Sequence, residues 1–213
     1  MQIKKNDFVE IEYLARLQDN NLVFDLTNEE QAKIHGLFDS KRKYKPIVVC
    51  IGKQDVIKGL DKELEGKEPG KSYTFTLSPE DAFGKKRTDL IKLVPTSIFR
   101  KQKINPMPGL QVNLDNIMGV VKTVAGGRTL VDFNHPLSGK TIIYEVKILK
   151  IITDPKEKLQ GMLSHLLAEF NLELNEGNAV IKSKLKEDTF KKELEKEILS
   201  RIPEIKSVNF NNL

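Results

Sequence analysis

The spacing of the apolar residues changes after residue 153, and this change constrains the fold more than any other feature. Before it, stretches such as FVEIEYLARL alternate between apolar and polar residues, which is typical of antiparallel strands. After it, apolar residues recur every three or four positions in 156–170 and 188–202, as in amphipathic helices. The 213 residues also exceed the length of most single domains. We therefore predict an α+β protein whose last part, 154–213, is a separate α/β domain in the order helix, strand, helix, strand.

The first 84 residues contain four predicted strands and a surface loop. The strands are FVEIEYLARL, LVFDLT, PIVVCIG and SYTFTL, separated by turn residues such as QDNN and EPGK. Residues 28–45 are polar and poorly periodic, so we expect a long surface loop there with one helical turn at Glu29–Ile34. The strongest strand pattern of the chain, TIIYEVKILKII, follows much later, at 141–152.

Between the third and fourth of these strands, DVIKGLDKELEG predicts a helix of about two turns. Its apolar residues share one face, at Val56, Ile57, Leu60 and Leu64. Asp55 stands where a helix N-cap is expected, and Gly66 stands where glycine often ends a helix. The periodicity by itself would place all four apolar residues in a core.

Residues 85–130 differ in composition from the sequence on either side. They hold nine lysines and arginines but only two acidic residues, Asp89 and Asp115. Three short strands are predicted there, in LQVNL, MGVVKTV and TLVDF, with a Gly-Gly turn before the last. Because the strand at 141–152 resumes a larger sheet, we predict a small β-rich domain at 85–130, inserted into a domain made of 1–84 and 131–153.

Motifs for nucleophilic, metal-dependent or nucleotide chemistry are missing from the sequence. His35, His135 and His165 stand far apart, without companions at metal-ligand spacing. There is no GxSxG, and GKEPGK lacks the spacing of a phosphate-binding loop. We therefore expect no metal and no cofactor, and any enzymatic reaction would proceed without a nucleophile.

The composition suggests the cytoplasm. MQIKKNDFVEIEY lacks the apolar core of a signal peptide, and no run of about 18 apolar residues is present, so we expect no membrane partner. Cys50 is the single cysteine, so an intrachain disulfide is excluded, as is usual in a reducing compartment. Its setting in PIVVCIG favours a buried strand residue over a nucleophile.

Three stretches resemble the FKBP-type peptidyl-prolyl cis-trans isomerases: EYLARLQDNNLVFD, GKQDVIKGLDKELEGKEPGK with SPEDAFG, and KTIIYEVKILKI. The break after Gly84, the run LIKLVPTSIF and the return through NHPLSGK resemble the SlyD-like branch, in which an insert-in-flap chaperone domain replaces the flap. Residues 154–213 are similar, in architecture only, to the C-terminal domain of long-type archaeal FKBPs. The resemblance implies an antiparallel sheet wrapped on a short helix and a cofactor-free isomerase.

The resemblance also implies an apolar pocket that binds proline. Its walls would be Tyr13, Phe24, Ile47, Val56, Ile57, Leu60, Phe83 and Tyr144, and the alternative for each aliphatic residue is plain core. Asp25 would be the polar group near the rotating amide, the backbone N–H of Ile57 would bind a substrate carbonyl, and His135 and Leu137 would border the pocket.

At two of these wall positions the sequence departs from the common family pattern. Leu60 stands where many single-domain members carry a tryptophan. Phe83 stands where a tyrosine is common, and a phenyl ring cannot donate a hydrogen bond.

The insert would bind unfolded or proline-containing chains through an apolar surface. Its candidate residues are Leu93, Val94, Ile98, Phe99 and Met107, although several of them must form the core of so small a unit. The basic charge suits acidic clients, ribosomes or RNA, with a solvated basic face as the alternative.

Two functions stay open: an isomerase that assists folding, and a holdase or interaction protein with weak or no isomerase activity. The thin core expected for 154–213 also suggests docking on a second copy of the chain, which would make a homodimer.

Overall fold

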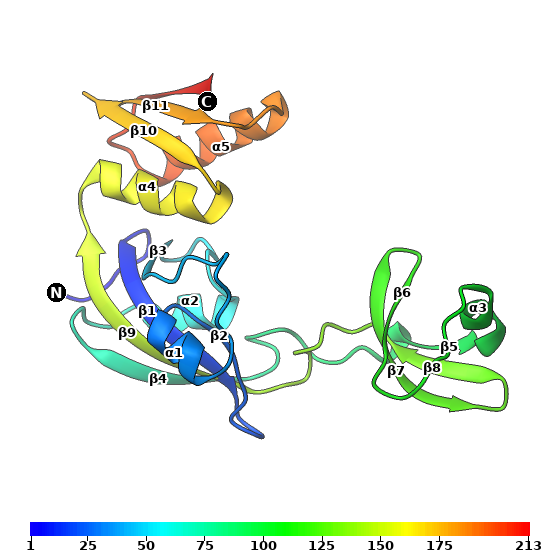
Figure 1. Ribbon diagram of the computed structural model, residues 1–213. Helices are drawn as coiled ribbons and strands as arrows, with labels where there is room; N and C mark the ends of the chain where they lie inside the picture. Colours follow the sequence, from blue (N-terminus) through cyan, green and yellow to red (C-terminus); the bar gives the residue numbers. More distant parts are fainter.

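The computed structural model describes residues 1–213 and contains three separate β-sheets, of five, four and three strands (Figure 1). The five-stranded sheet is antiparallel, and its strands follow the order β2-β1-β9-β4, with β3 also paired to β1. These strands are β1 (Phe8–Leu17), β2 (Val23–Leu26), β3 (Ile47–Cys50), β4 (Ser72–Leu77) and β9 (Ile142–Ile152). β9 pairs with both β1 and β4, so the strand that follows the insert completes the sheet of the first part, as predicted.

Two short helices complete this first part: α1 (Glu29–Ile34), in the long loop as predicted, and α2 (Lys58–Leu64). Leu60 and Leu64 of α2 are fully buried in a core with residues of β1, β4 and β9. Gly66 follows α2 with a positive φ of 78°, as expected for a glycine that ends a helix. The prediction for Asp55 was wrong: the N-cap residue is Ile57, which forms no side-chain cap, and the Asp55 carboxylate has other partners.

The insert forms the second part and lies apart from the rest of the chain, at the right of Figure 1. Its sheet has the order β5-β8-β7-β6, and one short helix packs with it. The elements are η1 (Thr88–Leu90), β5 (Ile91–Pro95), α3 (Thr96–Lys101), β6 (Gln111–Leu114), β7 (Ile117–Ala125) and β8 (Arg128–Asp132).

Three of these strands were predicted, and β5 and α3 were missed. β5 ends at Pro95, and because β5 is an edge strand, a proline is tolerated there. The predicted boundary after residue 130 also needs correction, because β8 continues to Asp132 and Val131 is fully buried in the core of the insert.

The third part consists of α4 (Pro155–Leu166), β10 (Phe170–Asn175), β11 (Asn178–Ser183), α5 (Asp188–Arg201) and β12 (Ser207–Asn212). β11 pairs antiparallel with β10 and parallel with β12. The prediction lacked β10 and continued the first helix to Phe170, whereas α4 ends at Leu166. β10 and β11 form a hairpin through Glu176 and Gly177, both with positive φ, and this tight turn explains how two strands fit between the helices. None of the five α-helices has the length and apolar character needed to cross a membrane.

The third part shares a hydrophobic core with the first (Figure 1). Phe8, Cys50 and Ile152 of the sheet are buried together with residues of α4, α5 and β11. Gly161 of α4 lies so close to β3 that a Cβ atom there would be 2.5 Å from the Cβ of Val48. The alternation in FVEIEYLARL suits a strand with one buried face, but Phe8 at its start is also buried because the third part covers it. The core that looked too thin in 154–213 is completed within the chain, which removes the reason to expect a dimer.

Candidate active site

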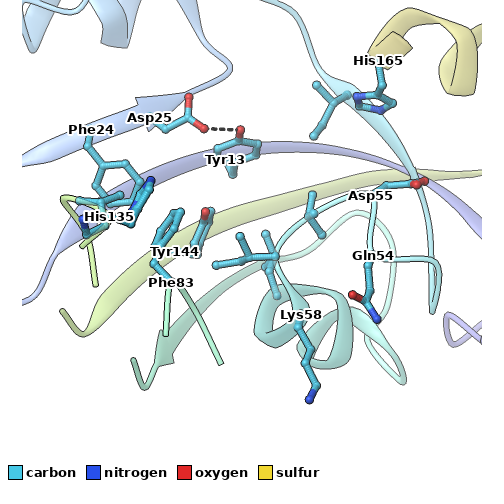
Figure 2. A pocket seen from close by; sticks show the side chains of 15 residues that line it. Tyr13, Phe24, Asp25, Gln54, Asp55, Lys58, Phe83, His135, Tyr144 and His165 are labelled. Atoms are coloured by element: carbon cyan, nitrogen blue, oxygen red, sulfur yellow. Dashed lines mark hydrogen bonds between the residues drawn. The ribbon is translucent and has the colours of Figure 1, made fainter. Parts of the chain in front are cut away.

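A cavity of about 770 Å³ opens on the first part, between the sheet and the start of α2. All residues that the resemblance placed in or beside a pocket line this one cavity (Figure 2). They are Tyr13, Phe24, Asp25, Ile47, Val56, Ile57, Leu60, Phe83, His135, Leu137 and Tyr144. The structure thus brings together side chains from β1, β2, β3, α2, β9 and both chain segments that lead to the insert.

Aromatic rings form one part of the cavity wall. The rings of Tyr13 and Tyr144 lie 5.5 Å apart between centroids, and Phe24 meets Phe83 edge-on at 6.0 Å. Phe83 in turn stacks on His135 at 4.9 Å, with the two rings nearly parallel. Such contacts restrain each ring through its neighbours, so the wall contains two groups of packed rings, Tyr13 with Tyr144 and Phe24 with Phe83 and His135.

Asp25 is the polar group of this wall, and its carboxylate is fully engaged. It accepts hydrogen bonds from the Tyr13 hydroxyl at 2.7 Å and from the backbone N–H of Leu26 at 2.9 Å. Nη2 of Arg42 donates to the same carboxylate at 2.8 Å and to the Leu26 carbonyl at 2.7 Å. These contacts fix the position of the negative charge at the edge of the cavity.

The two tyrosines remain protonated near neutral pH. Burial raises the pKa of both Tyr13 and Tyr144 well above the usual value, and the nearby Asp25 carboxylate adds to both shifts. The Tyr13 hydroxyl uses its proton on Asp25. The cavity therefore combines neutral phenols and apolar rings with the fixed carboxylate of Asp25.

The start of α2 supplies backbone donors to the cavity. No backbone carbonyl of the chain accepts from the N–H of Ile57, the residue that precedes the helix. Gly59 packs so tightly on the 78–84 turn that a Cβ would lie 2.6 Å from the Asp81 carbonyl oxygen. Only glycine permits this approach, which brings Phe83 beside the helix.

Four further residues line the cavity and were not predicted: Gln54, Asp55, Lys58 and His165. The first three flank predicted wall residues in sequence, so their neighbourhood could have suggested them. His165 comes from α4 of the third part, and nothing in a single sequence links that helix to β3. Its place in the site follows from the docking of two domains.

The five candidate residues of the insert do not line the cavity. Leu93, Ile98 and Met107 are exposed at 61%, 39% and 56%. Phe99 is fully buried in the core of the insert and Val94 packs against that core, so these two belong to the core alternative. Ile117 and Met118, at the start of β7, are also exposed and were missed.

Part of the positive charge of the insert is compensated internally. Lys86 and Lys122 reach the nearly buried carboxylate of Asp132 at 3.2 and 3.7 Å. Burial opposes ionisation of Asp132, but hydrogen bonds from Asn134 and Lys86 outweigh it and lower the pKa to about 2. These two lysines therefore serve the structure of the insert.

Known proteins match the chain in two ways. A model of the FKBP26 IF domain matches residues 92–137, which contain the whole of β6, β7 and β8. A short-type peptidyl-prolyl cis-trans isomerase of Methanocaldococcus jannaschii is 30% identical over 146 residues, 68% of this chain and 92% of that protein.

Bacterial relatives agree. The FKBP-type peptidyl-prolyl cis-trans isomerase SlyD of Vibrio cholerae is 28% identical over 156 residues, 71% of this chain and 69% of that protein. An FKBP-type 16 kDa peptidyl-prolyl cis-trans isomerase of Escherichia coli is 26% identical over 153 residues, 70% of this chain and 93% of that protein. The chain therefore belongs to the FKBP-type peptidyl-prolyl cis-trans isomerases, a family of enzymes.

Proposed function

We propose that the chain rotates X-Pro bonds in the cavity of its first part while its insert holds unfolded segments of the same client. The observation that carries the proposal is the single cavity that collects every wall residue implied by the sequence of a member of this family. The relatives act, by name, as peptidyl-prolyl cis-trans isomerases.

The reaction requires little from the protein beyond a shaped, dry surface. Rotation about the peptide bond meets a barrier of about 20 kcal/mol set by amide resonance, and no bond to the enzyme is needed. Only contacts that are tighter to the twisted amide than to the planar one accelerate the step. The fully buried Leu60 would be the apolar floor for the proline ring, beneath the aromatic wall.

The polar groups would orient the substrate. The N–H of Ile57 would donate to a substrate carbonyl, and this role is supported because no backbone carbonyl of the chain accepts from it. Asp25 would face the rotating amide with a charge held in place by Tyr13 and Arg42. Because the carboxylate is already oriented before substrate arrives, it needs no rearrangement during the rotation.

The insert would supply the first contact with an unfolded client. Its exposed Leu93, Ile98, Met107, Ile117 and Met118 give it an apolar surface, and methionine adapts to varied partners. A client held there keeps its prolines at a high local concentration near the cavity. A basic surface would further favour acidic clients.

A protease-free refolding assay with a proline-limited client tests the proposal. Phe24→Ala and Asp25→Ala should each slow catalysis, by about tenfold or more if the site works as described. Phe210→Ala, which truncates a partly buried phenylalanine on β12 far from the cavity, is the matched control and should leave catalysis unchanged.

The result also separates the two functions left open by the sequence. If neither cavity variant changes refolding while the chain still suppresses client aggregation, the protein is a holdase and the isomerase proposal is wrong. Loss of catalysis in the cavity variants with aggregation still suppressed would establish two sites with separate tasks.

A further inference from the structure

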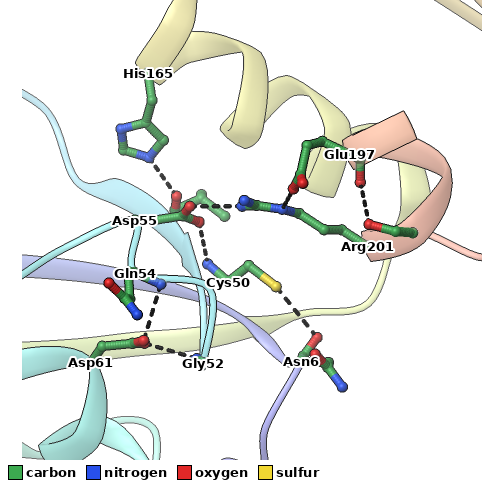
Figure 3. Close-up of polar contacts among 11 residues, drawn as sticks. Asn6, Cys50, Gly52, Gln54, Asp55, Asp61, His165, Glu197 and Arg201 are labelled. Carbon is green, nitrogen blue, oxygen red and sulfur yellow. Dashed lines mark hydrogen bonds and ion pairs between the residues drawn. The ribbon is translucent and has the colours of Figure 1, made fainter. Parts of the chain in front are cut away.

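The loop between β3 and α2, residues 51–57, contacts the third part of the chain at Asp55, where Arg201 lies beside it (Figure 3). Its last two residues, Val56 and Ile57, line the cavity. Whatever holds this loop therefore also sets the position of the cavity rim. The inference below rests on the isomerase function proposed above.

From below, α2 holds the first half of the loop. The carboxylate of Asp61, nearly buried, accepts from the backbone N–H groups of Gly52 at 2.9 Å and Gln54 at 3.1 Å. Both loop residues have a positive φ, of 83° and 59°, so the chain turns sharply around this carboxylate. These contacts stay within the first part and end before Asp55.

The second half of the loop is held at Asp55, by β3 and by the third part. One oxygen of Asp55 accepts from the backbone N–H of Cys50 at 2.8 Å, and the other pairs with Nη1 of Arg201, the last residue of α5, at 2.7 Å. The two side chains are only 16% and 13% exposed. Nε of Arg201 is bound to Glu197 at 2.8 Å, which fixes the guanidinium group on its own helix.

The side of the loop that faces the third part is not closely packed. A second hollow of about 380 Å³ borders Gln54, Asp55 and His165, which also line the first cavity. Since space is left beside the loop, the Asp55 carboxylate is restrained by the Cys50 hydrogen bond and the Arg201 ion pair, and only the ion pair comes from the third part. A shielded pair of this kind is costly to break from one side, because the other charge stays behind without a partner.

A second contact anchors the strand that leads into the loop. Nε2 of His165 lies 2.6 Å from the carbonyl oxygen of Val48 on β3, and β3 pairs with β1 alone within the sheet. The absent side chain of Gly161 lets α4 approach this strand. The third part thus contacts both ends of the segment 48–55.

We propose that the third part completes the proline-binding site, with Arg201 as a positioning residue that holds the cavity rim through Asp55. The guanidinium group touches neither the substrate nor the reacting bond. It keeps the loop in the conformation in which Val56 and Ile57 face the cavity, and His165 supports it from β3.

Substitution of Arg201 in the full chain tests this role on a short proline peptide. Arg201→Met should lower kcat/KM about five- to tenfold, mainly through a higher KM, because the substrate would have to order the rim. Arg201→Lys keeps a cation beside Asp55 and should restore most of the activity. Lys158→Met is the control, because it breaks the partly buried ion pair with Glu204 inside the third part and does not touch the loop. It should leave kcat/KM unchanged.

The single cysteine gives an independent readout of the loop. Cys50 is fully buried and burial raises its pKa to about 11, so a thiol reagent should react slowly with the wild type. Arg201→Met should accelerate this reaction about tenfold at constant pH, whereas Lys158→Met should not. Loss of the cation alone would disfavour the thiolate and slow the reaction, so acceleration reports opening.

A double-mutant cycle decides whether Arg201 acts through Asp55. Asp55→Asn combined with Arg201→Met should lose no more activity than either single variant. Additive losses, or equal effects of Arg201→Met and Lys158→Met on an active enzyme, would overturn the inference and leave the proposed function intact. A wild type without isomerase activity would overturn both. If Arg201→Met does not fold, Asp55→Asn with Arg201→Lys carries the same comparison.

Discussion

The insert and the third part are attached to the first part of the chain in opposite ways. The insert has its own core, built on Phe99, and joins the first part only through its two chain segments. The third part shares a core with the sheet through Phe8 and places His165 in the cavity. An attachment with a separate core can move and bind clients independently, whereas one with a shared core becomes a structural part of the site it covers.

The strongest test of this difference is Phe8→Ala. Removing a fully buried phenyl ring from the shared core should cost about 3–5 kcal/mol and destabilise the first and third parts together. In a urea titration, the unfolding midpoint measured by tyrosine fluorescence, which arises only from the first part, should fall together with the midpoint measured by the NMR signals of β11. Signals of β7 in the insert should keep their midpoint.

Val112→Ala is the reciprocal variant, because Val112 is buried in the core of the insert. It should lower the urea midpoint of the β7 signals alone. If Phe8→Ala shifted tyrosine fluorescence without the signals of β11, the first and third parts would unfold separately and the comparison would fail.

Acid should weaken the insert selectively through Asp132. The pKa of this carboxyl is about 2 in the folded insert and about 3.9 in an unfolded chain. Its contribution, about 2 kcal/mol, is complete above pH 4 to 5 and is lost as the pH falls toward 2. The midpoint of the β7 signals in urea should therefore fall between pH 5 and pH 2.5.

Asp132→Asn supplies the baseline for this measurement. The variant should be less stable at pH 6 and show a weaker loss of stability on acidification, since it lacks the titrating carboxyl. Equal pH dependence of the urea midpoint in the wild type and in Asp132→Asn would show that the charge of Asp132, beside Lys86 and Lys122, does not stabilise the insert.

The exposed apolar residues of the insert should matter for protein clients and not for short peptides. Replacing Leu93, Met107 and Met118 together by serine should slow proline-limited refolding of a protein client about tenfold, because the proposed client-binding residues would be lost. The kcat/KM for a proline peptide should stay unchanged. The control is Leu22→Ser with Ile34→Ser, which changes two exposed apolar residues of the first part.

Much of this arrangement could be predicted from the sequence because it depends on local patterns. Alternation located the strands of the first sheet, and the motif around Val56 and Ile57 identified residues that do line one cavity. Asp55 shows where local reasoning failed. A carboxylate before a helix is usually its cap, but this one forms an ion pair with Arg201, 146 residues later.

The same limit explains the other misses. Phe170 continues the helical spacing of α4 by coincidence, so the periodicity extends the predicted helix to the start of β10. Phe99 and Met107 could not be separated by type, since both are apolar residues of a small domain and only the tertiary packing buries the first. Contacts between domains leave no mark in the periodicity of either one.

The smallest expected effect concerns the side of the cavity that borders the insert. Phe83 and His135, on the two chain segments that lead to the insert, stack at 4.9 Å and form a wall without a phenol. Phe83→Tyr adds a hydrogen-bond donor there, and we expect kcat/KM on a proline peptide to change by no more than about twofold, because the ring itself supplies the packing.

The contrast with Phe83→Leu makes the result decisive. Leucine removes the stacking on His135 and the edge-on contact with Phe24, so activity should fall further than with tyrosine. A large gain from Phe83→Tyr would instead show that a donor at this position binds the substrate carbonyl, and that the segments beside the insert contribute a polar contact to the substrate.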